Sequence, residues 1–266
     1  MEISLSSKYR QLQKIFLQHQ EVAIAFSGGV DSSFLLHTAC VTLGCSAVHA
    51  FHARSELQSS TEAARVGRAI QECGCFFHPI EIKPFSWPEF VANGSGRCYH
   101  CKKKIYQTFL VHPSFPADAF LFDGTNHDDF GQDRPGLRAV AELKVQTPLA
   151  EVGFTKKEIR LLSKEFSLSS WNAYSSSCLA TRIAQGEPLT REKILLVSKC
   201  EALLQEKGFM GVRVRLSKET ATIAVLQKDL GELQKNHVFS AIKHEFMSLG
   251  LRGVVLDSQG RPDWTG

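Results

Sequence analysis

The pattern of apolar and polar positions divides the chain into two regions of different texture. In residues 1–187, short apolar runs at 22–26, 46–51, 76–82 and 119–122 alternate with longer polar stretches. Continuous apolar runs of this length, rich in β-branched residues, are typical of buried parallel strands. Strands that alternate with helix-length stretches predict an α/β fold with a doubly wound parallel sheet.

Helical spacing of apolar residues places helices between these strands. We expect an amphipathic helix within residues 1–20, and Thr155 with Glu158 resembles a capping box that starts another. Segments without such a period are predicted to be irregular. The further expected helices follow residue 33 and cover 59–72, 97–109 and 155–166, and the expected irregular segments are 84–96, 134–138 and 171–186.

From residue 188 the pattern changes to one typical of an α+β unit. Its order predicts a helix, a hairpin, a long helix and a last strand, at 190–207, 211–216 with 220–226, 230–249 and 253–257. Such a unit can form a small domain of its own. We therefore expect domains at 1–187 and 188–266.

Composition and charge narrow the functional classes. The 266 residues are 43% hydrophobic and 22% charged, which is enough for a sizeable core. No apolar run approaches about 18 residues and the first residues do not resemble a signal peptide, so we expect no membrane span. Eight cysteines without a secretory signal favour reduced thiols in the cytoplasm. A net charge of +4 suits an anionic small molecule and does not require nucleic acid.

Residues 27–33, Ser-Gly-Gly-Val-Asp-Ser-Ser, form the strongest local pattern, which we call the phosphate loop. They follow an expected strand and precede an expected helix, so free backbone N–H groups and the helix dipole converge on an anion. Gly28 and Gly29 allow close approach of a phosphate, and Ser27, Ser32 and Ser33 add hydroxyl donors. Asp31 could hold the Mg²⁺ that accompanies a polyphosphate.

Three cysteines form a second candidate site. Cys98 and Cys101 open an expected helix as a CxxC pair, which favours thiolates, and Cys178 lies in a distant Ser-rich loop. Such a set could bind three irons of a [4Fe–4S] cluster and leave the fourth iron open to external sulfur. Cluster-free sulfur chemistry, or zinc with His100 or His127, remain alternatives. The other cysteines are expected to pack in the core.

Further polar residues fall where ligands sit in parallel sheets, beyond the carboxyl ends of strands. Asp123 and Gly124 end one expected strand, and Arg54 follows another, near where adenine is expected. Arg182, four residues after Cys178, could bind a phosphate of a nucleotide ligand. The same strand end carries Asp128 and Asp129, which could help Mg²⁺ or nucleotide or simply cap a turn.

The phosphate loop alone resembles that of ATP pyrophosphatases, which adenylate a substrate and release pyrophosphate. The chain adds RCYHCKK at 97–103, DGTNHDD at 123–129, RPGLRA at 134–139, SSSCLATRI at 175–183 and GVRVR at 211–215. This ordered set, which covers nearly the whole length, resembles the LarE family of ATP-dependent sulfur transferases.

The resemblance implies adenylation of the carboxylates of a pyridinium dicarboxylate mononucleotide, followed by sulfur insertion to give thiocarboxylates for a nickel-pincer cofactor. Cys178 matches the family's sulfur-donating cysteine. With Cys98 and Cys101 the chain looks like the three-cysteine branch, in which a [4Fe–4S] cluster carries the sulfur. The resemblance also makes Glu201 a candidate site acid and implies ring-like homo-oligomers, and a sulfur donor would be needed to reload the site.

Substrate binding can also be argued from the residues. Arg213 and Arg215 alternate on an expected strand and so share a face, where two guanidinium groups suit phosphate and carboxylates. The alternative is a solvated strand face with structural ion pairs.

Other functions remain open from the sequence. A tRNA thiolase also pairs a phosphate loop with cysteines, but should add a basic RNA-binding surface. An ammonia-using synthetase would not need the cysteines. A nucleotide-binding sensor would bind ATP without releasing pyrophosphate.

Overall fold

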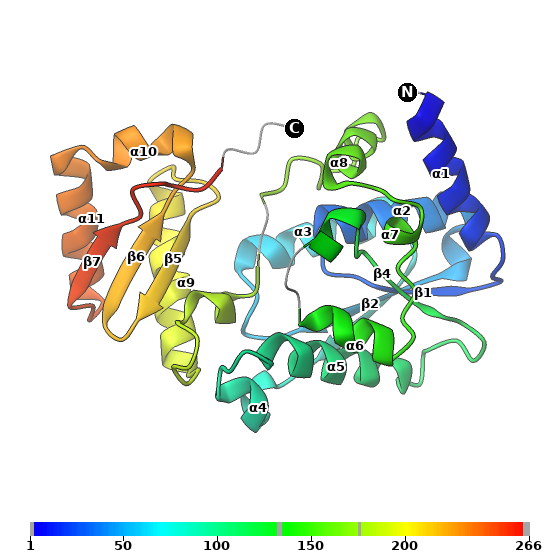
Figure 1. Cartoon of the computed structure of the whole chain (residues 1–266), viewed down its shortest axis with the longest axis horizontal. Coiled ribbons are helices and arrows are strands. Elements are labelled where there is room, and N and C mark those ends of the chain that lie inside the picture. The colour runs from blue at the N-terminus through cyan, green and yellow to red at the C-terminus, as the bar shows by residue number, and fades with distance from the viewer. Residues whose placement is uncertain (1–2, 132–134, 175–176, 263–266) are drawn as a thin grey trace.

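The computed structural model describes residues 3–131, 135–174 and 177–262 and contains two sheets (Figure 1). The larger sheet has the strand order β3-β2-β1-β4, with every neighbouring pair parallel. This confirms the predicted α/β fold. The strands are β1 (Val22–Ala25), β2 (Val48–Arg54), β3 (Phe76–Glu81) and β4 (Leu121–Asp123).

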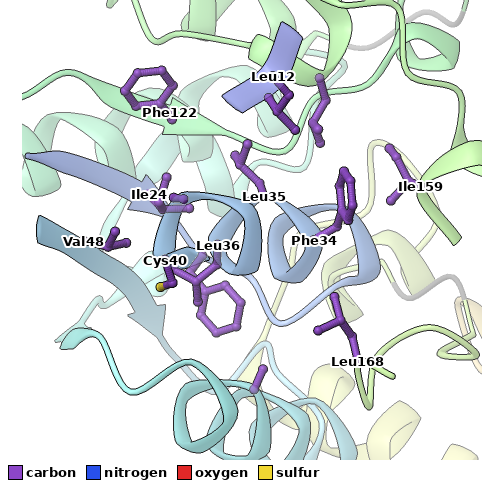
Figure 2. Packing of buried hydrophobic residues seen from close by; sticks show 14 of the residues in the cluster. Leu12, Ile24, Phe34, Leu35, Leu36, Cys40, Val48, Phe122, Ile159 and Leu168 are labelled. Carbon is purple, nitrogen blue, oxygen red and sulfur yellow. The ribbon is translucent and has the colours of Figure 1, made fainter. Parts of the chain in front are cut away.

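Alternation along β1 sends side chains into two separate cores. Val22 and Ile24 enter a cluster with α1 (Ile3–Phe16) and α2 (Val30–Leu43), part of which is shown in Figure 2. Ala23 and Ala25 enter a cluster with the helix α5 (Arg97–Leu110) on the opposite face. All four residues of β1 are buried, because helices cover both faces of the sheet. This explains why the sequence of β1 is apolar throughout and does not alternate.

Local sequence signals explain where two of the helices begin. Ser59 caps α3 (Ser60–Cys73) in a capping box with Glu62. Thr155 caps α8 (Lys156–Glu165) in the same way with Glu158, as its sequence predicts. The remaining helices and 3₁₀ turns of the first region are η1 (Cys45–Ala47), η2 (Pro84–Ser86), α4 (Pro88–Val91), η3 (His127–Gly131), α6 (Gly136–Glu142), α7 (Pro148–Glu151) and η4 (Leu179–Arg182).

The three segments expected to be irregular each contain short structured elements. Residues 84–96 include α4, and α6 begins within the predicted loop 134–138 because Pro135 sits at its N-cap, where its fixed φ suits a helix start. Residues 171–186 include η4. Arg134 and Ser175–Ser176, which belong to two of the quoted motifs, lie outside the described residues.

The C-terminal sheet has the order β5-β6-β7, with β5 and β6 antiparallel and β6 and β7 parallel. The predicted hairpin and last strand are confirmed, but the predicted single helix over 230–249 is wrong. The chain forms two helices there, with an extended Lys235 between them. The elements are α9 (Arg191–Glu206), β5 (Arg213–Ser217), β6 (Thr220–Ala224), α10 (Gln227–Leu233), α11 (Asn236–Ser248) and β7 (Gly253–Leu256).

The periodicity of the apolar residues explains the break. Leu233 and Ile242 are both buried, but nine residues along one helix they would point about 180° apart. Two helices at an angle let both side chains enter the same core.

That core also holds residues from the first region. Leu57, Phe90, Leu179 and Ile183 are buried in the same cluster as the side chains of α9 and of the C-terminal sheet. The two regions therefore pack against each other (Figure 1), and the domain division near residue 187 stays a prediction. No helix in the described part of the chain is both long and apolar enough to cross a membrane.

Candidate functional site

The phosphate loop joins β1 to α2 as a strand–turn–helix. Its serine hydroxyls are ordered by one another: Ser27 Oγ lies 3.0 Å from Ser32 Oγ, and Ser32 Oγ donates to the carbonyl oxygen of Gly29 at 3.2 Å. The first turn of α2 places its N–H groups at the mouth of this loop, which is the expected anion site.

Two glycines are required by close packing around the loop. Gly28 has a φ of +74°, and a methyl group added there would lie 2.6 Å from Cγ2 of Val66 on α3. A methyl group on Gly124, just after β4, would lie 2.9 Å from the backbone nitrogen of Ser32. Gly124, a predicted nucleotide contact, thus packs directly against the start of α2.

Asp31 pairs with Lys156 of α8. Burial raises the pKa of Asp31, which the Lys156 charge partly opposes. The second carboxylate oxygen, Oδ1, is buried and accepts no hydrogen bond from the part of the chain that the structure describes. An orphaned carboxylate oxygen at the end of a phosphate loop suits Mg²⁺, which binds oxygen ligands.

The structure brings the three predicted cysteines to one cavity. Cys98 and Cys101 come from the first turns of α5, and Cys178 precedes η4; all three line a cavity of about 300 Å³. Arg97 Nη2 donates to the Cys98 sulfur at 3.5 Å, and its Nη1 donates to the Ala180 carbonyl at 3.0 Å. Arg97 thus ties the helix to the loop that carries Cys178.

Burial, together with the charges of Cys178 and Cys98, raises the pKa of the Cys101 thiol to about 12. Burial also raises the pKa of Cys178 to about 11, although its side chain reaches the solvent of the cavity. The three sulfurs are therefore close enough to interact electrostatically. Within residues 3–131, 135–174 and 177–262, no three His, Cys, Asp or Glu side chains are grouped to hold a metal ion. The donor set suits an iron–sulfur cluster chemically, but its side chains would have to converge.

The cysteines and the phosphate loop share a wall. A second cavity, of about 380 Å³, is lined both by Gly29, Asp31 and Lys156 and by Cys101 and Cys178. A polyphosphate over the loop would therefore lie beside the thiols. Six residues line both this cavity and the first one: Ser27, Ala53, Gln58, Cys101, Ile105 and Cys178.

The acidic residues at the end of β4 and just after it either hold a lysine or cap backbone groups. Asp123 is buried and accepts from Lys102 Nζ at 2.8 Å and from Tyr106 OH at 2.9 Å, which holds Lys102 at the wall of the cysteine cavity. Asp128 and Asp129 accept backbone N–H groups at 2.8 and 3.0 Å, from Lys156 and Asn126. Through these contacts Asp128 caps the start of α8 and Asp129 caps the turn after β4.

Arg182 and Glu201 form a buried pair. Arg182 Nε donates to Glu201 Oε1 at 2.6 Å, and the two side chains are 5% and 9% exposed. Arg182 also donates to Ser177 Oγ at 2.7 Å, next to Cys178, while Glu201 accepts from the Val214 amide at 2.9 Å. The pair connects the cysteine loop to α9 and β5. It does not line the cavity that holds the phosphate loop.

Arg213 and Arg215 share a face of β5, as predicted. Val214 and Leu216 between and after them are buried. Arg215 is exposed, lies 4.0 Å from Asp257 and lines a cavity of about 570 Å³ together with Cys98. Burial, together with the nearby arginine charges, lowers the pKa of Arg213 to about 10. Arg54, by contrast, pairs with Glu81 at 3.3 Å and lines none of these three cavities.

Sequence reasoning did not single out Lys156, Arg97 or Gln58 as site residues. Lys156 had a signal, because the capping box places it in the first turn of a helix near a ligand edge. Arg97 directly precedes the CxxC pair. Gln58 had none, since it lies in a turn whose position depends on how β2 and α3 pack.

No family model matches the chain. The pyridinium-3,5-bisthiocarboxylic acid mononucleotide synthase of Lactiplantibacillus plantarum is 31% identical over 258 residues, which are 97% of this chain and 92% of the relative. The chain belongs to the LarE family.

Two further relatives of this LarE chain have names that state no activity. An uncharacterized protein of Synechocystis is 30% identical over 256 residues, covering 96% of this chain and 95% of the relative. An uncharacterized protein of Methanocaldococcus jannaschii is 26% identical over 231 residues, covering 85% and 86%. The matches therefore span both sheets of the fold.

Proposed function

We propose that this chain is an ATP-dependent sulfur transferase that forms a pyridinium bisthiocarboxylic acid mononucleotide. It adenylates the carboxylates of the dicarboxylate mononucleotide, releases pyrophosphate and replaces carboxylate oxygen by sulfur. One observation carries the proposal: the phosphate loop and Cys178 line the same cavity, in a member of the LarE family. The relative's name, a synthase of the bisthiocarboxylic acid nucleotide, supports the same product.

In the first step a substrate carboxylate oxygen attacks the α-phosphorus of ATP, and pyrophosphate leaves. The N–H groups at the start of α2 stabilise the charge on the departing pyrophosphate, and the Ser27 and Ser32 hydroxyls, which bond to each other and to the Gly29 carbonyl in the free protein, would rotate to donate to it. Asp31 would hold Mg²⁺ through its buried Oδ1, and Mg²⁺ would neutralise phosphate charge. Lys156, beside Asp31, adds a positive charge on the same side.

In the second step sulfur attacks the adenylated carboxyl carbon and AMP leaves. In the free protein Cys178, with its pKa raised to about 11, is a thiol at neutral pH. Cys98, Cys101 and Cys178 would hold a [4Fe–4S] cluster, which supplies an open iron to carry external sulfur. Binding would release the thiol protons, since the ligands are thiolates.

The substrate's own anionic groups need a separate site. Arg215 and Cys98 line one cavity, so a nucleotide held by Arg215 would lie beside the cysteines. Arg213 lies on the same strand face. Arg182 and Glu201, paired with each other, are best placed to fix the Cys178 loop rather than to contact ATP phosphates.

The test follows pyrophosphate release and iron separately. With ATP, Mg²⁺ and the dicarboxylate mononucleotide, the wild type is expected to release pyrophosphate, and Asp31→Asn to lose at least tenfold in rate. After anaerobic purification the wild type is expected to be brown, and Cys98→Ala colourless. Pyrophosphate release without the mononucleotide, or full activity of Asp31→Asn, would contradict the proposed adenylation. An iron-free wild type that cannot be reconstituted would leave the adenylation standing and remove the cluster.

A further inference from the structure

Gln58 is held in one orientation by a buried histidine. His52 is 3% exposed, and its Nδ1 lies 2.7 Å from the carbonyl oxygen of Phe26, the residue before the phosphate loop. Because a carbonyl oxygen only accepts, Nδ1 must carry the hydrogen. Burial lowers the pKa of His52, so the ring is neutral and its Nε2 is an acceptor.

The amide of Gln58 must match that acceptor. Gln58 Nε2 lies 3.1 Å from His52 Nε2, and only the NH₂ side of the amide can donate there. The carbonyl Oε1 of Gln58 is therefore turned away from His52. The ring of His52 is itself confined, since it stacks on Phe77 at a centroid distance of 6.0 Å.

Gln58 lies where the orientation of its amide decides which ligand group it can bind. It is one of the residues that line both the cysteine cavity and the cavity over the phosphate loop, beside Ala53 and Ile105. Ile82 completes an apolar wall in the second cavity. Such a wall suits the flat, weakly polar nucleoside part of ATP when its phosphates lie over the loop. An acceptor at this point cannot serve a phosphate or carboxylate, which are acceptors themselves.

We infer that Gln58 Oε1 accepts a hydrogen bond from the nucleoside of ATP, and that His52 is the positioning residue that fixes this polarity. The inference rests on the proposed function, because it needs ATP in this site. Two donors of the nucleoside have the right chemistry, the 6-amino group of adenine and the ribose hydroxyls. ITP, which carries an oxygen in place of the 6-amino group, tests the first, and 2′-deoxy-ATP and 3′-deoxy-ATP test the second.

The experiment measures Mg²⁺-dependent binding of ATP and the three analogues by calorimetry. The wild type is expected to bind one analogue at least tenfold more weakly than ATP, because a site built around a hydrogen bond rejects a ligand that cannot make it. Gln58→Leu should weaken ATP binding, so that the affinities for ATP and for that analogue differ by less than about threefold. Gln58→Glu, which keeps an acceptor, should weaken all nucleotides but retain the ratio. Gln107→Leu, at an exposed position of α5, is the matched control.

His52→Phe should abolish the same preference for ATP over the analogue. The double variant with Gln58→Leu should bind ATP no more weakly than the single variants, since both residues act through one contact. A thermal melt of each variant verifies folding, and the ratio is unaffected by a general loss of affinity. Equal binding of ATP and all analogues by the wild type, or an unchanged ratio in Gln58→Leu, would overturn the inference alone. A wild type that binds no ATP would overturn the proposed function.

Discussion

The Arg182–Glu201 pair provides a quantitative test of how the cysteine loop is anchored. The two side chains are 5% and 9% exposed and meet at 2.6 Å. Arg182→Leu would leave the Glu201 carboxylate buried, with the Val214 amide donating to it at 2.9 Å. Removing one partner of a buried ion pair costs about 3–5 kcal/mol, a large part of a domain's total of about 5–15 kcal/mol.

Two further variants separate the charge from the packing. Arg182→Leu combined with Glu201→Gln buries no charge and keeps the bond from Val214, so at least half of the loss should be recovered. Arg191→Leu is the control, because the Arg191–Glu56 pair has a similar distance of 2.8 Å but is 65% and 39% exposed. An exposed pair of this kind contributes less than about 1 kcal/mol.

The assay is urea denaturation at pH 7.5, with the free energy of unfolding extrapolated to water and the slope compared between variants. The reasoning is refuted if Arg182→Leu costs no more than Arg191→Leu. It is also refuted if the double variant is as unstable as Arg182→Leu alone.

Three further predictions address the phosphate loop, acid stability and nucleic acid. Gly28→Ala should lower the free energy of unfolding by about 1–3 kcal/mol and weaken ATP binding, because Gly28 has a positive φ and an added methyl group would meet Val66. Gly67→Ala on α3, where an added methyl group has no atom within 4 Å, should do neither, and equal effects of the two variants would contradict this. Burial alone would raise the pKa of Asp123, but its ion pair with Lys102 brings it below its ordinary value. Its contribution is therefore complete above about pH 4 and lost as the pH falls through the lower folded pKa. Asp123→Asn should flatten the acid dependence of the unfolding free energy below about pH 4, and an unchanged slope would argue against it. No salt-sensitive gel shift with tRNA is expected at low salt, and finding one would favour the thiolase alternative.

The order of strands and helices could be predicted because their apolar periods are strong. The capping box at Thr155 set the start of α8 to within a residue. The helix expected after residue 33 begins earlier, at Val30, so that Asp31, Ser32 and Ser33 lie in its first turn. The break between α10 and α11 could not be predicted, since it depends on Leu233 and Ile242 entering one core. No proline or capping side chain marks it, and only the packing decides.

The site was predictable in its parts but not in its assembly. The phosphate loop and the three cysteines were found as local motifs, and the fold brings them to adjoining cavities. Ala53 and Ser55 line the cavity over the phosphate loop, whereas Arg54 between them pairs with Glu81, and its role near adenine stays a prediction. The orientation of Gln58 depends on its hydrogen bond to His52, which is itself fixed by the backbone carbonyl of Phe26. A sequence motif does not reveal such contacts.

The central claim is that sulfur replaces oxygen on an adenylated carboxylate beside Cys178. The direct measurement is mass spectrometry of the mononucleotide and of the protein after reaction with ATP, Mg²⁺ and sulfide. We expect oxygen-to-sulfur exchange in the wild type, and none in Cys178→Ala, which should still release pyrophosphate. Loss of H₂S from Cys178 would identify that thiol as the sulfur donor. Thiocarboxylate formation at the full wild-type rate by Cys178→Ala would contradict the account.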